Sequence, residues 1–245
     1  MIIASSMLDA PWRQYARGAC LPSRFAHAIK SPMNTRVVIA SAVSASACAA
    51  VGLALAQANA PAKPAAEAKV PVVRAAAEAL PFSDCTFDVA LALMTVHHWK
   101  DLHRGLAELR RVSRRQVIFT FDPAMHDSLW VFTDYVPASM GFAKDAPIEI
   151  VLDALETDRV EIVPTPADCT DGFASAYWRR PEQYLSPIAR GNISAFARLD
   201  RSQVEPGMDQ LARDLASGIW QERYADLLAK ETLDCGLRLV IGGAG

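Results

Sequence analysis

The chain has 245 residues, 51% of them hydrophobic, so it is long and apolar enough to bury a sizeable core, which excludes wholesale disorder. Its formal net charge of -2 disfavours a surface that neutralises many phosphates, and we predict no nucleic-acid partner. The five cysteines are far apart and form no C-x-x-C pair, which predicts neither a disulfide framework nor a metal site. A reducing compartment fits this pattern best, so we expect a cytoplasmic protein.

The first third of the chain has an unusual composition. Residues 1–35 show no sustained period of 2 or 3.6, which predicts an irregular N-terminal segment. Residues 37–62 are uncharged and rich in alanine, and we favour a buried strand over 36–41 followed by an Ala-rich helix. Two alternatives stay open: a secretory signal starting at Met33 and ending at the A-x-A pattern of residues 58–60, and a transmembrane helix. Ala and Ser contribute little free energy of transfer into a membrane, which disfavours the transmembrane helix, so we expect no stable membrane insertion.

From residue 70 onward, strand-like and helix-like segments alternate. Residues 70–74 form a short β candidate, and the almost uninterrupted apolar run over 87–95 predicts a strand buried on both faces. Asp101 is placed to cap a helix whose Leu102, Leu106 and Leu109 share one face, and residues 116–121 predict the next strand. This order with short connections predicts an α/β fold with a doubly wound, mostly parallel sheet and ligands at the carboxyl ends of its strands.

The last third continues the alternation less regularly. We expect a strand over 159–164, helices around 181–199 and 204–230, and a final strand over 236–241.

Three stretches together resemble a known family. Residues 72–91 read V-V-R-A-A-A-E-A-L-P-F-S-D-C-T-F-D-V-A-L, residues 95–99 read T-V-H-H-W, and residues 102–112 read L-H-R-G-L-A-E-L-R-R-V. In combination they resemble the class I S-adenosylmethionine-dependent methyltransferases, and most of all the small-molecule group called type 11. The resemblance implies a Rossmann-like methyltransferase domain over residues 36–245, in which the aromatic segments within about 124–235 look like a substrate cover.

The resemblance also implies a cofactor and the residues that bind it. The cofactor would be S-adenosylmethionine, and the methyl acceptor a small organic molecule. In this family the loop after the third strand holds the adenine, and the carboxyl end of the fourth strand lies beside the methionine part. The positions implied for cofactor binding are Ser41, Ala76, Ala77, Glu78, Ala92, Leu93 and His97.

The sequence departs from the family pattern at three places. No acidic residue occurs between Pro32 and Glu67, so the acid that ends the second strand in the family and binds the ribose hydroxyls cannot be placed. Ala76 stands where the family has an acid for the adenine amino group, and residues 42–46, after the first predicted strand, contain no glycine. Non-glycine residues reach positive φ only at an energetic cost. The alternative to an active methyltransferase is therefore a catalytically degenerate protein of the same fold that serves as a binding or interaction module.

His97 and His98 are the candidate catalytic residues. An imidazole titrates near neutral pH, so either could accept a proton from the methyl acceptor, and in the other interpretation they only shape the cofactor wall. Adjacent residues on an extended strand point to opposite faces, which argues against a shared metal ion.

Overall fold

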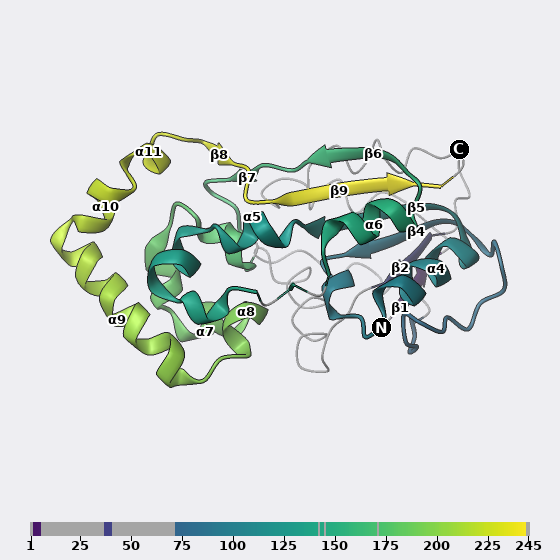
Figure 1. Ribbon diagram of the computed structural model, residues 1–245, viewed down its shortest axis with the longest axis horizontal. Helices are drawn as coiled ribbons and strands as arrows, with labels where there is room; N and C mark the ends of the chain where they lie inside the picture. Colours follow the sequence, from purple (N-terminus) through teal and green to yellow (C-terminus); the bar gives the residue numbers. More distant parts are fainter. Residues whose placement is uncertain are drawn as a thin grey trace, which may run out of the picture.

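The computed structural model describes residues 2–5, 37–40, 72–141, 143–144, 146–170 and 172–243. Within them the chain forms a twisted sheet at one end and a group of short helices at the other, as Figure 1 shows. The irregular segment predicted for residues 1–35, the Ala-rich helix and Ser41 lie outside the described residues, apart from one short strand over residues 2–5.

One seven-stranded sheet dominates the described part, and its order is β3-β1-β2-β4-β5-β9-β6. The strands are β1 (Ile2–Ser5), β2 (Val37–Ala40), β3 (Val72–Val73), β4 (Phe87–Leu93), β5 (Ser113–Phe121), β6 (Thr157–Ile162) and β9 (Leu237–Gly242). A second, two-stranded sheet pairs β7 (Thr165–Pro166) with β8 (Thr232–Leu233). The strands predicted near residues 36–41, 70–74, 87–95, 116–121, 159–164 and 236–241 are confirmed within a few residues.

The sheet is mixed. β4 pairs in parallel with β2 and β5, whereas β1 pairs antiparallel with β2 and β3 and β9 pairs antiparallel with β5 and β6. Two of these six pairings are thus parallel and four antiparallel, because each strand that runs against the rest makes two antiparallel pairings. The prediction of a mostly parallel sheet therefore holds for the three central strands and not for the flanks.

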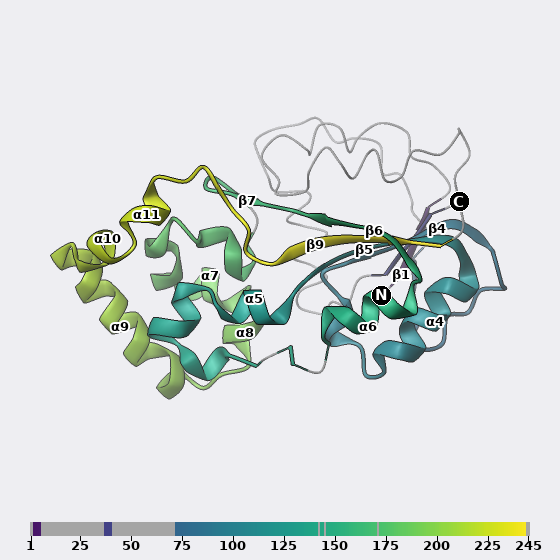
Figure 2. The ribbon, with the colours of Figure 1, turned by 45° about the horizontal axis from the view of Figure 1, so that its top comes forward.

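Both faces of the central strands are buried. Ala90, Ala92 and Ile118 pack against α4 (Leu102–Val112) and α6 (Ile148–Ala154), which cover one face of the sheet (Figure 2). Val89 and Leu91 alternate with them and belong to a core cluster on the other face. This alternation explains why the strand reads as a nearly continuous apolar run.

The helix α4 forms where the sequence predicts it. The Asp101 carboxylate accepts a hydrogen bond from the Arg104 backbone amide at 3.0 Å and caps the first turn. Leu102, Leu106 and Leu109 all face the sheet, as their spacing requires.

Except for the one-turn helix that follows β4, the remaining helices form what we call the helical lobe, residues 123–139 and 174–228. It contains α5 (Pro123–Asp127), η2 (Val131–Tyr135, a π-helical turn), η3 (Pro137–Ser139), η4 (Ala174–Tyr177), η5 (Pro181–Leu185), α7 (Pro187–Gly191), α8 (Ser194–Ala197), α9 (Arg201–Ser217), α10 (Ile219–Arg223) and α11 (Ala225–Leu228). The helical regions predicted around 181–199 and 204–230 are confirmed, but turns divide them into shorter helices.

An aromatic core holds the helical lobe together. Trp130, Trp178, Tyr184 and Trp220 are buried within it, and the Trp130 ring packs edge-on against Tyr184 at 5.4 Å and Trp220 at 5.2 Å between centroids. In α9, a Cβ added to Gly207 would lie 1.9 Å from a backbone oxygen of η2. Only glycine lets these two helices approach so closely. No helix in the described part of the chain is long and apolar enough to span a membrane.

Candidate functional site

The carboxyl ends of two neighbouring parallel strands define the candidate site. β4 and β5 run side by side, with Leu93 opposite Phe119. The one-turn helix η1 (Val96–His98) follows β4, and α5 follows β5 after Asp122, whose carboxylate caps α5 by accepting from the Ala124 amide at 2.9 Å. Side chains from both connections therefore meet at one edge of the sheet, where open α/β folds bind ligands.

The two candidate histidines lie together. His97 and His98 occupy a helical turn rather than an extended strand, and their ring centroids are 4.0 Å apart. The expectation that they point to opposite faces is therefore wrong, because the strand ends at Leu93, before it reaches them. Among the described residues, no group of three or more His, Cys, Asp or Glu side chains could hold a metal ion.

Aromatic rings from the sheet and from the helical lobe extend this pair of histidines. His97 packs on Phe121 at 4.9 Å, Phe121 on His126 at 4.7 Å, and His126 on Phe132 at 4.7 Å between centroids. Phe132 in turn contacts Phe196 of α8 at 5.7 Å. We call His97, His98, Phe121, His126, Phe132 and Phe196 the strand-end ring cluster. It joins the end of the sheet to the helical lobe through aromatic contacts.

Burial keeps these histidines uncharged, and Arg198 adds to the effect at His97 and His98. Desolvation, followed by the nearby His98, His126 and Arg198, lowers the pKa of His97 to about 3. Desolvation and then Arg198 also lower the pKa of His98. Desolvation lowers the pKa of His126, although the neighbouring Asp127 opposes the shift. Neutral imidazoles therefore line the strand ends at physiological pH.

Arg198 sets the proton position on His98. A guanidinium Nη2 of Arg198 lies 3.4 Å from Nδ1 of His98. Because a guanidinium has no acceptor, Nδ1 must accept in this contact, so a neutral His98 carries its proton on Nε2. In this tautomer Nε2 of His98 is a hydrogen-bond donor, and Nδ1 can accept from another group only when the contact with Arg198 opens.

The loop after β3 places Ala76, Ala77 and Glu78 in a tight turn, with the Ala79 amide donating to the Ala76 carbonyl at 3.2 Å. Ala76 is exposed. Oε1 of Glu78 accepts from the backbone amides of Lys100 at 2.8 Å and Asp101 at 3.1 Å. Desolvation raises the pKa of Glu78, but these backbone hydrogen bonds outweigh it and the pKa is lowered. The Glu78 carboxylate thus ties the loop to the start of α4.

Two charged residues of α4 hold the next part of this loop. Glu108 accepts from the Leu80 amide at 2.7 Å, and Arg111 donates to the carbonyls of Leu80 at 3.0 Å and Phe82 at 2.7 Å. Arg111 also binds Glu108 and Asp84. This polar clamp explains why the L-P-F-S-D and E-L-R-R segments occur together in the sequence.

The other predicted cofactor residues lie at the strand end. Ala92 pairs with Ala40 of β2 and Ile118 of β5 and has no exposed surface, so its side chain belongs to the core. Leu93 is half-buried. The structure thus brings Leu93 and His97 to one edge of the sheet, while residues 76–78 lie in the loop that packs on the start of α4.

Sequence reasoning missed His126, Arg198 and the phenylalanines of the strand-end ring cluster. Arg198 meets His98 from 100 residues further along the chain, and no spacing in the sequence indicates such a contact. His126 lies one helical turn after Asp122 and Pro123, which follow β5. A search for polar side chains near the carboxyl end of this predicted strand could therefore have identified it.

Two comparisons with known proteins identify the family of the chain. Residues 31–121 match the model of a family described as a methyltransferase domain. A solved structure assigned as a methyltransferase of an antibiotic biosynthesis pathway in Anabaena variabilis is 31% identical, and the match covers 69% of this chain and 71% of that chain with a TM-score of 0.61. The chain belongs to the class I S-adenosylmethionine-dependent methyltransferases, in the type 11 group. This methyltransferase also has a weaker match to an S-adenosylmethionine-dependent methyltransferase of Thermotoga maritima.

That second structure is 22% identical, and the match covers 37% of this chain and 47% of that chain with a TM-score of 0.29, which is too low to support an argument. None of the curated proteins matches the chain.

The cysteines differ from expectation in one respect. Cys169 is disulfide-bonded, whereas Cys85 and Cys235 carry free thiols. Spacing alone did not indicate this, because a disulfide joins residues that only the fold brings together.

The cytoplasmic location stays a prediction.

Proposed function

We propose that this methyltransferase transfers a methyl group from S-adenosylmethionine to a small organic molecule at the carboxyl ends of β4 and β5. The observation that carries the proposal is the strand-end ring cluster, in which His97 packs on His98 and on Phe121 of β5, and Phe121 connects them through His126 to Phe132 of the helical lobe. Direct displacement requires mainly alignment of the acceptor and exclusion of water. A largely apolar cluster closed by the helical lobe suits both needs.

The described residues fit the methyl-donor end of the cofactor. When bound, S-adenosylmethionine supplies an electrophilic methyl group on a positively charged sulfur. His97 stays neutral at physiological pH because burial lowers its pKa, so it does not repel a cation. Leu93 and His97 would form the wall beside this end, and Ala76, Ala77 and Glu78 would lie toward the adenine.

His98 has a separate role in the proposal. With its proton on Nε2, it donates a hydrogen bond that orients an oxygen or nitrogen lone pair of the acceptor. The helical lobe, including Phe132 and Phe196, covers the acceptor and keeps water out.

Calorimetric titration of the protein with S-adenosylmethionine tests the cofactor assignment. Binding with a dissociation constant below the millimolar range supports it. His98→Ala should then leave cofactor affinity unchanged within about twofold and weaken methyl transfer, because the proposed hydrogen bond goes to the acceptor alone.

A second candidate function rests on Ala76. This exposed residue cannot accept a hydrogen bond from the adenine amino group, as the acid of the family pattern does. If the titration shows no binding at millimolar cofactor, a degenerate methyltransferase fold that serves as a binding module is the better assignment.

A further inference from the structure

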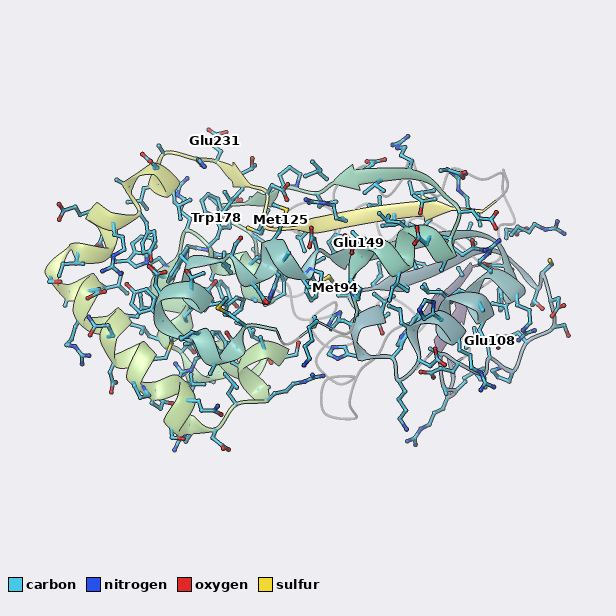
Figure 3. The ribbon with its side chains drawn as sticks, in the orientation of Figure 1. Met94, Glu108, Met125, Glu149, Trp178 and Glu231 are labelled. Carbon is cyan, nitrogen blue, oxygen red and sulfur yellow. The ribbon has the colours of Figure 1, made fainter. Side chains whose placement is uncertain are left out.

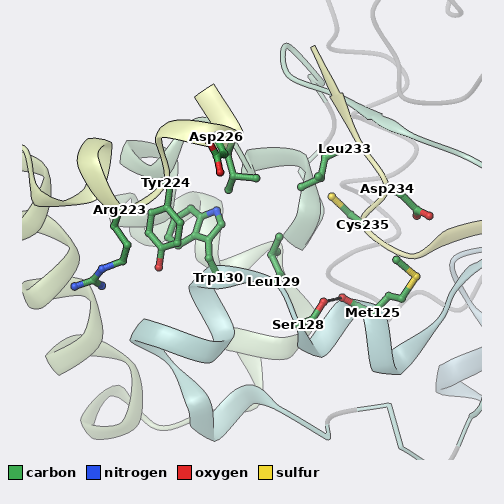
Figure 4. A pocket seen from close by; sticks show the side chains of 11 residues that line it. Met125, Ser128, Leu129, Trp130, Arg223, Tyr224, Asp226, Leu233, Asp234 and Cys235 are labelled. Atoms are coloured by element: carbon green, nitrogen blue, oxygen red, sulfur yellow. Dashed lines mark hydrogen bonds between the residues drawn. The ribbon is translucent and has the colours of Figure 1, made fainter. Parts of the chain in front are cut away.

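The helical lobe contains a pocket apart from the strand ends. Its volume is about 370 Å³, and it lies between the α5–η2 segment, helices α10 and α11, and the chain that leads into β9. Figure 4 shows Trp130 and Tyr224 on one side and Leu129, Leu233 and Cys235 on the other. The volume is sufficient for a small organic molecule.

The pocket and the strand-end ring cluster share a wall. Residues 123–135 contribute His126 and Phe132 to the ring cluster and Leu129 and Trp130 to the pocket. None of the histidines at the strand ends lines the pocket. A ligand there would therefore be separate from the reacting groups.

Hydrogen bonds fix the aromatic wall in place. The Trp130 indole N–H donates to the Trp178 carbonyl at 2.8 Å, and the Tyr224 hydroxyl donates to Asp134. The two rings lie 5.4 Å apart. Because these polar groups are already satisfied, the rings offer the pocket their apolar surfaces without reorganisation.

The charges around the pocket favour a cation. Arg223 lies 3.7 Å from Asp134 and 3.8 Å from Asp214, so two carboxylates face one guanidinium. Asp234 pairs with Arg238 at 2.7 Å. Asp226 is exposed at the rim and forms no ion pair with another described residue. Arg223, Asp226 and Asp234 line the pocket, so its lining carries a formal charge of -1.

The thiol in the pocket adds no charge. Desolvation raises the pKa of Cys235 to about 11, so the thiol stays protonated at neutral pH. The inner wall is therefore apolar and the rim acidic.

We propose that this pocket binds a small organic cation with an aromatic or apolar body, such as an arylalkylamine, as a second ligand distinct from the methyl donor. The body of the ligand packs between the aromatic wall and Leu233, and its ammonium group lies near Asp226. The carboxylate of Asp226 attracts the ammonium ion, and the aromatic rings pack on the apolar body.

Three probes that differ only in charge test the proposal by calorimetry. 2-Phenylethylamine should bind most tightly, 2-phenylethanol more weakly and phenylacetate weakest. Asp226→Lys should weaken amine binding about tenfold, because the charge at the rim changes sign. Asp209→Lys is the matched control, since Asp209 is exposed on α9 and does not line the pocket. The affinity of this variant for 2-phenylethylamine should stay within about twofold of that of the unmodified chain.

Hydrogen exchange locates the ligand. Saturating 2-phenylethylamine should slow amide exchange in residues 224–235, which contribute six of the residues that line the pocket, and leave α4 unaffected, as measured by mass spectrometry. The proposal is overturned if the amine does not bind at millimolar concentration, if phenylacetate binds equally well, if both lysine variants lose the same affinity, or if residues 224–235 are not protected. Asp226→Lys should bind S-adenosylmethionine as the unmodified chain does, so failure here is distinguishable from failure of the proposed transfer.

Discussion

The sheet region and the helical lobe are stabilised by different contacts. At the sheet, apolar strands pack on α4 and α6, and the loops around them are fixed by charged side chains, chiefly Glu78, Glu108 and Arg111. In the helical lobe, short helices surround large rings such as Trp178 and Tyr184. The loops at the sheet should therefore respond to pH and charge, whereas the helical lobe should respond to the loss of volume.

Truncation of Trp178 should have the largest effect. Its side chain, labelled in Figure 3, has no exposed surface, and its indole N–H donates to the Thr165 carbonyl at 3.1 Å. Trp178→Ala should lower the free energy of unfolding by about 3–5 kcal/mol because it leaves a cavity and an unsatisfied carbonyl. Urea denaturation, monitored by circular dichroism, measures this free energy of unfolding. Ile188→Ala, at a side chain that is 81% exposed, is the control, and equal losses would contradict the comparison.

Neutralising Glu108 should have the next largest effect. Glu108→Gln should cost about 1–2 kcal/mol at neutral pH, since charge-assisted bonds to Arg111 and the Leu80 amide weaken. Its hydrogen bond with Arg111 lowers the pKa of Glu108 below 4.5, so this stabilisation is present above pH 4.5 and is lost as the pH falls through the folded-state pKa.

The control for this variant is Glu149→Gln, at an exposed glutamate on α6 (Figure 3). Denaturation from pH 7 to pH 3 should show the cost of Glu108→Gln shrinking toward zero, with no such trend for Glu149→Gln. A pH-independent cost would mean that Glu108 acts by packing.

Restoring the missing acid tests the cofactor loop. Ala76→Asp should strengthen S-adenosylmethionine binding about tenfold by adding a charge-assisted hydrogen bond. Ala79→Asp places the same charge at an exposed position of the same turn. If titration shows equal gains for both variants, the effect is general electrostatics and not recognition of the adenine amino group.

At neutral pH the smallest expected effect is that of His97, because its contribution to stability changes only in acid. Because its pKa is lowered to about 3, the unfolded chain binds a proton below pH 6.5 that the folded chain does not. Stability should therefore decline as the pH falls from about 6.5 toward 3, and His97→Gln should remove this part of the decline. Identical pH profiles for the two proteins would show that the pKa of His97 is the same in the folded and the unfolded chain.

Sequence reasoning succeeded where local physics decides the structure. The apolar run that became β4, the Asp101 cap and the leucine spacing of α4 each specify one element without reference to the rest of the chain. It failed where distant segments meet. Nothing near residue 98 indicates Arg198, and the histidines were placed on an extended strand because no sequence signal marks its end at Leu93.

The mixed sheet also depends on distant segments of the chain. β4 and β5 are joined by a short helical crossover, which requires parallel pairing. The direction of β9 depends on how the chain returns from the helical lobe, and the sequence between residues 122 and 236 does not encode that path in any local pattern.

The position of β9 also bears on the order of events during synthesis. β9 lies between β5 and β6, and its Leu237 pairs with Phe121, 116 residues earlier. A ribosome therefore releases β5, α6, β6 and the whole helical lobe before the strand that joins them exists. Until then β6 has no neighbour within the described sheet and β5 presents an unpaired edge, which is a template for pairing with other chains. A nascent chain paused between residues 163 and 236 should accordingly need a chaperone to shield that edge.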